Sequence, residues 1–163
     1  MAEAFRFANL AMWQQRVRTV AVARRRNEGG RPFAELLAES DVPAQRSWRP
    51  FQLAFLLVNL PSLADPAHPE RAHDTGLVDL LFFPTGGGKT EAYLGLAAFA
   101  MVLRRLRHRG DEGLAGAGVS VIMRYTLRLL PLDQLARAAG LVCALELERD
   151  TDAERYGAWP FEI

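Results

Sequence analysis

The chain has almost no cysteine and no long apolar run. Cys143 is the single cysteine in 163 residues, so an internal disulfide is excluded, and its apolar helical surroundings are typical of a small core residue. The longest apolar stretch, residues 92–103, is too short to cross a bilayer. The N-terminus lacks the apolar segment and cleavage site of a secretory signal. These absences favour a cytoplasmic protein without a membrane partner.

Charge of one sign is not in excess either. The chain has 20 Lys and Arg against 19 Asp and Glu, so its net charge neither requires nor excludes a polyanionic partner. His68, His73 and His108 have no cysteine or carboxylate at ligand spacing, which argues against a metal site built on histidine. Half of the residues are apolar, enough to bury one core but not two motor domains.

The most informative segment is Pro-Thr-Gly-Gly-Gly-Lys-Thr at residues 84–90. Consecutive glycines let backbone N–H groups close around phosphate oxygens, and a helix that follows directs its positive N-terminus at the same anion. We therefore expect a nucleoside-triphosphate site in which Lys89 contacts the β- and γ-phosphates and Thr90 holds Mg²⁺. The alternative is a glycine-rich turn with an incidental lysine.

Hydrophobic periodicity predicts the elements around this loop. Residues 1–47 are expected to be an accessory helical segment, because apolar side chains recur at helical spacing from residue 3 to residue 26 and a short helix follows Pro32. Residues 48–163 are expected to contain a helix, a strand, a helix, a strand and a helix, at residues 50–60, 77–83, 89–108, 119–123 and 131 onward. This order predicts an α/β fold, a partial RecA-like P-loop domain with parallel strands and flanking helices.

The loop resembles the form found in superfamily 2 helicases and translocases, Pro-Thr-Gly-x-Gly-Lys-Thr. It departs from the strict P-loop pattern at Phe83, where that pattern has glycine. In superfamily 2 a glutamine upstream of the loop reads the adenine edge, so the resemblance implies this role for Gln52. The alternative is that Gln52 faces solvent on an amphipathic helix.

Residues 124–130 follow the second expected strand, where superfamily 2 proteins carry motif Ia. The match is partial, because Tyr125 replaces the usual proline of that motif. The resemblance implies that Arg124, Thr126 and Arg128 contact nucleic-acid phosphates. Alternatively, the arginines only solvate the end of a strand.

Three stretches together, residues 49–55, 83–96 and 123–130, resemble the DrmA-like helicase subunit of DISARM, a prokaryotic anti-phage defence system. The likeness covers roughly residues 48–150. It implies ATP-dependent remodelling of nucleic acid, with DNA expected as the substrate and other phage-defence subunits as partners. It also implies that ATP and Mg²⁺ are bound by Gln52, Thr85, Gly86, Gly87, Gly88, Lys89, Thr90 and Glu91.

The acidic pair that hydrolysis requires is not found in the sequence. Glu146 is the nearest acidic residue after an apolar run, but it lies within a helical pattern and has no adjacent carboxylate. We therefore expect an amino-terminal fragment of a longer helicase that binds Mg·ATP and does not hydrolyse it alone. Two alternatives are a noncatalytic nucleic-acid-binding or assembly module and another P-loop NTPase, such as a small kinase.

Overall fold

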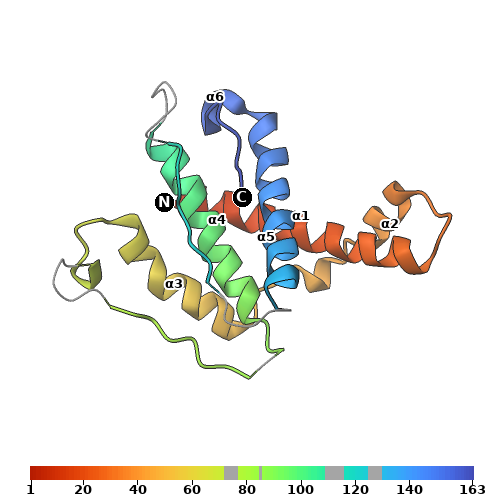
Figure 1. Ribbon diagram of the computed structural model, residues 1–163, viewed down its shortest axis with the longest axis horizontal. Helices are drawn as coiled ribbons and strands as arrows, with labels where there is room; N and C mark the ends of the chain where they lie inside the picture. Colours follow the sequence, from red (N-terminus) through yellow and green to blue (C-terminus); the bar gives the residue numbers. More distant parts are fainter. Residues whose placement is uncertain (72–76, 85, 109–115, 125–129) are drawn as a thin grey trace.

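The computed structural model describes residues 1–71, 77–84, 86–108, 116–124 and 130–163. Figure 1 shows two long helices, α4 and α5, lying side by side across α1, with α3 along α4 and α2 at the far end of α1. The described elements are α1 (Ala2–Asn27), α2 (Phe33–Ser40), the 3₁₀ turn η1 (Pro43–Gln45), α3 (Pro50–Ala64), the 3₁₀ turn η2 (Pro69–Arg71), α4 (Lys89–Arg107), α5 (Leu130–Thr151) and α6 (Ala153–Tyr156).

The helices expected from the sequence are confirmed. In α1, buried side chains recur three or four residues apart, as in Ala4, Phe7, Ala8 and Ala11, so that one stripe of the helix faces the interior. Arginines in its last turn lie at the negative end of the helix dipole. α3 begins at Pro50, whose missing N–H is not needed in the first turn. Within the described residues, no helix has the length and apolar content to cross a membrane.

The core is built around α4. Phe99 and Val102 of this helix are 0% exposed, and they belong to one cluster with Phe7 of α1 and Leu141 and Leu145 of α5. α4 contacts α1, α3, α5 and α6. The N-terminal helix therefore shares its interior with the later helices, and the boundary placed after residue 47 stays a prediction.

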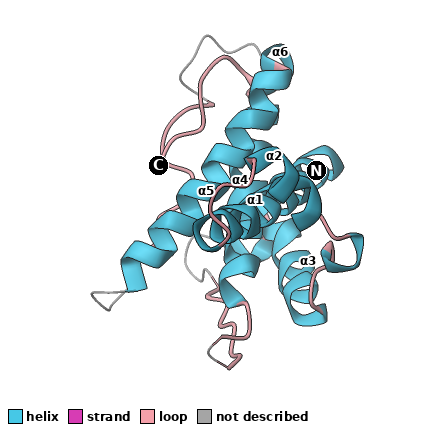
Figure 2. Ribbon diagram, turned by 90° about the vertical axis from the view of Figure 1, so that its right-hand side faces the viewer, coloured by secondary structure: helices cyan, strands magenta, loops and turns pink. Residues whose placement is uncertain are grey.

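The α/β RecA-like fold predicted from the sequence is wrong for this structure. Figure 2 draws helices and loops, and no strand, in the described ranges. Residues 77–83 and 119–123, predicted as parallel strands, have no regular secondary structure. Several of their apolar side chains are exposed: Val78 is 91%, Phe82 90% and Ile122 86% exposed. A strand needs a neighbouring strand for its backbone hydrogen bonds, and the described residues contain no strand that could pair with these segments.

Ion pairs fasten α2 to the end of α1. Glu39 of α2 accepts hydrogen bonds from Arg31 at 2.5 Å and from Arg24 at 2.8 Å. Arg24 and Arg31 also pair with Glu28. The hydrogen bonds from Arg31 and Arg24 lower the pKa of Glu39 to about 2. This network holds the short α2 against α1, together with Leu36, which is completely buried.

Candidate functional site

Pro84 and residues 86–88 belong to a tight turn that leads directly into α4. The N–H of Gly87 donates to the carbonyl of Pro84 at 3.1 Å. Gly86 and Gly88 have φ angles of +79° and +92°, the left-handed region that glycine enters without steric cost. Gly88 is the N-cap of α4, and no side chain caps this helix. The loop therefore brings main-chain N–H groups to the positive end of a helix.

Two of the glycines are required by close neighbours as well as by backbone conformation. A Cβ at Gly87 would lie 2.9 Å from the carbonyl oxygen of Pro84. A Cβ at Gly88 would lie 2.8 Å from Nε2 of Gln52. Gly87 and Gly88 thus allow the main chain of the loop to approach the carbonyl of Pro84 and the side chain of Gln52 on α3.

Replacing Gly88 by alanine is expected to lower the free energy of unfolding by about 2–3 kcal/mol. About 1–2 kcal/mol comes from the left-handed φ of a non-glycine residue, and about 1 kcal/mol from displacing the Gln52 hydrogen bond. Urea unfolding measures the change. Gly30→Ala is the matched control, because Gly30 has a φ of +91° but a methyl group there would have nothing within 4 Å. An equal loss in both variants would contradict a clash with Gln52.

The first turn of α3 holds the loop in place. Arg49 donates from Nη1 to the Gly87 carbonyl at 2.7 Å, and Gln52 donates from Nε2 to the Gly88 carbonyl at 2.7 Å. The side-chain oxygen of Gln52 also accepts from the Arg49 N–H at 2.9 Å. Phe51 stacks on Phe83 with ring centroids 3.8 Å apart. Arg49, Phe51 and Gln52 thus fix both ends of the turn.

Gln52 lies beside the loop, where the sequence places an adenine-reading residue. Its side chain is buried, with 5% exposure, so the alternative of a solvent-facing glutamine does not describe this structure. Its amide uses one donor and one acceptor to connect α3 to the loop, and a primary amide has one more of each. Contact with adenine stays a prediction.

Lys89 folds back over the entrance of the loop. Its ammonium group donates to the carbonyl of Phe83 and, at 3.1 Å, to that of Pro84. This chain contains no other lysine. Both acceptors are neutral main-chain carbonyls, which an anion can replace as a stronger partner.

Glu91 and Arg137 join the start of α4 to α5. Arg137 donates from Nη2 to one oxygen of Glu91, while the other oxygen, Oε2, is buried without a hydrogen-bond partner in the described structure. Gly88 lies next to this carboxylate, since a Cβ there would be 3.4 Å from Oε2. Sequence reasoning missed Arg137 and Arg49, because only the fold brings them to the loop.

A groove of about 580 Å³ extends from the loop toward α1. Among the described residues, the groove is lined by four arginines, Arg16, Arg46, Arg49 and Arg137, and by one carboxylate, Glu91. Two tryptophans also contribute to its walls, Trp13 and Trp48. The volume is within the range of small-molecule sites, about 300–1,000 Å³. Its charge and aromatic surface suit an anion that carries a flat ring.

The remaining predicted residues lie elsewhere or outside the described ranges. Thr90 is half-buried in the first turn of α4. Thr85, Thr126 and Arg128 fall outside the described residues. Arg124 is exposed and lines a separate cleft beside Tyr93, not the groove at the loop. The structure therefore brings Gln52, Gly86 to Gly88, Lys89, Thr90 and Glu91 together, and it does not place Arg124 with them.

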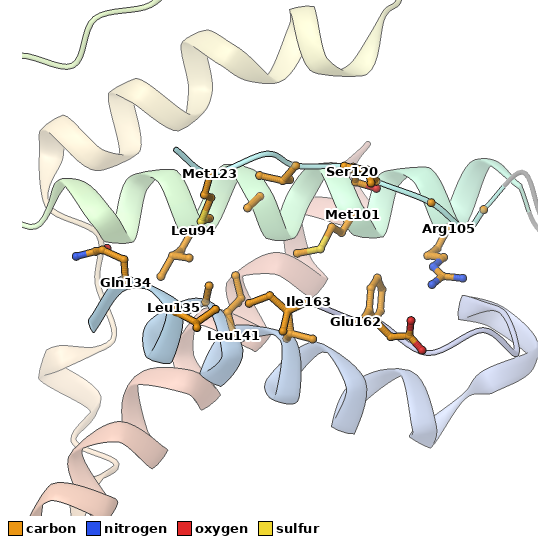
Figure 3. Close-up of a pocket in the computed structure, with 18 of the residues that line it drawn as sticks. Leu94, Met101, Arg105, Ser120, Met123, Gln134, Leu135, Leu141, Glu162 and Ile163 are labelled. Carbon is orange, nitrogen blue, oxygen red and sulfur yellow. The ribbon is translucent and has the colours of Figure 1, made fainter. Parts of the chain in front are cut away.

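A second cavity, of about 540 Å³, lies between α4, α5, the segment 116–124 and the end of the chain. Figure 3 shows Leu94, Met101, Leu135, Leu141 and Ile163 around it. It shares no lining residue with the basic groove. Because its walls are mainly apolar, it has few groups that would recognise a charged ligand.

Glu146, the acidic residue considered in the sequence, has a structural environment. It pairs with Arg149 at 2.6 Å and accepts the N–H of Phe161 at 2.9 Å. The hydrogen bond from Arg149 lowers the pKa of Glu146. These contacts tie the end of the chain to α5.

Comparison with known proteins supports the resemblance expected from the motifs. The chain aligns with the DISARM protein DrmA of Bacillus paralicheniformis (strain ATCC 9945a / NCIMB 11709 / CD-2) at 48% identity over 103 residues. This chain is similar to DrmA. The aligned residues make up 63% of this chain. No family model and no solved structure matches it.

The chain corresponds to a small part of DrmA, since the alignment covers 9% of that protein. Identity of 48% over this length is enough to confirm a DrmA-like sequence. It does not carry the activity of the whole of DrmA to this chain.

Proposed function

We propose that this chain is a nucleotide-binding part of a DrmA-like DISARM protein and that residues 84–90 bind the phosphates of Mg·ATP. One observation carries the proposal: a left-handed glycine turn, clamped by Arg49 and Gln52, leads into the uncapped N-terminus of α4, and Lys89 lies across it. Phosphate loops combine main-chain N–H groups, a helix N-terminus and a lysine in this way.

Each group has a separate role in this proposal. Lys89 exchanges its carbonyl partners for oxygens of the β- and γ-phosphates, where the hydrogen bonds are charge-assisted. The first N–H groups of α4, which have no acceptor within the helix, donate to the same phosphates. Thr90 holds Mg²⁺ through its hydroxyl, and the ion neutralises phosphate charge.

The likeness to DrmA suggests the setting in which nucleotide binding is used. DrmA is named as a DISARM protein, so we propose a role in defence against phage, with other subunits of such a system as partners. In this proposal the whole protein is a DNA helicase or translocase of the cytoplasm. Arg124, Thr126 and Arg128 stay proposed contacts for DNA phosphates.

Acetylation of the single lysine tests the phosphate role directly. Mg²⁺ with a nonhydrolysable ATP analogue is expected to slow acetylation of Lys89 several-fold, because a phosphate-bound ammonium is not available as a free amine. Mass spectrometry measures the modification. The N-terminal amine of the same molecule is the internal control, and its rate should not change. Equal acetylation of Lys89 with and without the nucleotide would contradict the proposal.

A further inference from the structure

The basic groove does not end at the phosphate loop. Beyond Gly86 and Gly88 it continues along one side of α1 and along the connector that precedes α3. The lining residues from these two regions include Trp13, Arg16, Gln45, Arg46, Trp48 and Arg49. The N-terminal helix thus forms a wall of the same groove that contains the loop.

This wall is already held in place by its own contacts. The indole N–H of Trp48 donates to Oδ1 of Asn9 at 2.6 Å, and its ring packs so closely on α4 that a Cβ at Gly95 would lie 2.9 Å from Cη2. The indole N–H of Trp13 donates to Asp41 at 2.8 Å. A ligand that enters the groove therefore meets an ordered surface and loses little free energy in arranging it.

Arg16 differs from Arg46, which also lines the wall. Arg46 is paired with Asp41 at 2.5 Å and lies over the ring of Trp13 at 4.7 Å. Arg16 donates to the neutral side-chain oxygen of Gln45 at 3.3 Å. An exposed guanidinium with a long bond to an amide can take a ligand acceptor without breaking an ion pair.

We propose that α1 forms the nucleoside end of the nucleotide site and that Arg16 contacts the base or ribose. The inference rests on the proposed function, because the phosphates must occupy the loop for the nucleoside to reach α1. One connected groove is lined by Gly86 and Gly88 of the loop, by the two tryptophans and by Arg16. A guanidinium donates to base and ribose acceptors and stacks on flat rings, as this position requires. Residues 1–47 then contribute to nucleotide binding, in addition to supporting the core.

The test compares two ligands that share their phosphates. A Mg²⁺-loaded nonhydrolysable ATP analogue and Mg²⁺-loaded inorganic triphosphate are titrated by calorimetry into the wild-type chain, Arg16→Ala and Arg26→Ala. Loss of a charged hydrogen bond is worth about tenfold in affinity. Arg16→Ala is therefore expected to weaken binding of the ATP analogue about tenfold and to leave the affinity for inorganic triphosphate unchanged. Arg26→Ala, an exposed α1 residue outside the groove, should change neither ligand.

The outcomes separate this inference from the proposed function. If the wild type binds both ligands and Arg16→Ala weakens neither, or both equally, α1 does not contact the nucleoside and the inference fails alone. If the wild type binds neither ligand, the proposed function fails and the inference fails with it. A single-stranded oligonucleotide is titrated as a third ligand. If Arg16→Ala weakens its binding but not that of the ATP analogue, the groove is a nucleic-acid site and the inference fails. Circular dichroism checks that Arg16→Ala is folded. The titration is repeated with Arg16→Gln, whose side chain is neutral and longer than that of alanine.

Discussion

Lys89→Ala is expected to weaken binding of a nonhydrolysable Mg·ATP analogue about 100-fold. The variant removes the only ammonium side chain of the chain and two charge-assisted hydrogen bonds to phosphate in the proposed complex. At about 1.5 kcal/mol for each bond, the loss is roughly 3 kcal/mol, and each 1.4 kcal/mol is a factor of ten. Isothermal titration calorimetry measures both affinities.

Two controls make the result specific to the phosphate role. Lys89→Gln keeps a hydrogen-bond donor without the charge and should also bind weakly, because a neutral amide does not offset phosphate charge. Thermal unfolding without nucleotide should change little in either variant, since the hydrogen bonds of Lys89 go to the carbonyls of its own exposed loop. Equal affinity of wild type and Lys89→Ala would remove the basis of the proposed function.

The second large effect concerns the core. Phe99→Ala is expected to lower the free energy of unfolding by about 3–5 kcal/mol, because the side chain is 0% exposed and its removal leaves a cavity between α4 and its neighbours. Phe82→Ala is expected to change the free energy of unfolding by less than about 0.5 kcal/mol, because Phe82 is 90% exposed. Urea unfolding of the two variants gives the comparison.

This pair of phenylalanines distinguishes the two architectures. In the RecA-like arrangement expected from the sequence, residues 77–83 are a covered strand, and Phe82→Ala would cost as much as a core substitution. In the helical structure, of these two substitutions only Phe99→Ala lowers the free energy of unfolding substantially. Comparable losses at the two positions would contradict the helical arrangement around α4.

The helices could be predicted from the sequence because their signals are local. The apolar stripe of α1, Pro50 at the start of α3 and the glycines before α4 act within one or two turns of the chain. The strands could not be predicted reliably, because a strand exists only with a partner. The apolar pattern of residues 77–83 and 119–123 gives no information about whether that partner is present.

The site likewise combines features that depend on neighbouring residues with features that depend on residues distant in the sequence. The loop glycines and Lys89 could be found from their spacing alone, since adjacent residues supply the geometry. Arg49, Arg137 and Arg16 could not, because each reaches the groove from a different helix or connector. The sequence did contain one indication for Arg49, which belongs to the same stretch, residues 49–55, as Gln52. For Arg137, nothing near it in the sequence indicates its ion pair with Glu91.

α4 connects the loop to most of the molecule. It has 19 residues, about 28 Å at 1.5 Å per residue, and its first turn is the proposed phosphate contact. The same helix packs against α1, α3, α5 and α6. A rigid helix that packs against neighbours along its whole length cannot move at its first turn without moving the residues it contacts elsewhere. A displacement of α4 caused by ligand binding at the loop would therefore also move the other end of the helix. There Arg105 donates a hydrogen bond to the carbonyl of Pro160 at 2.7 Å.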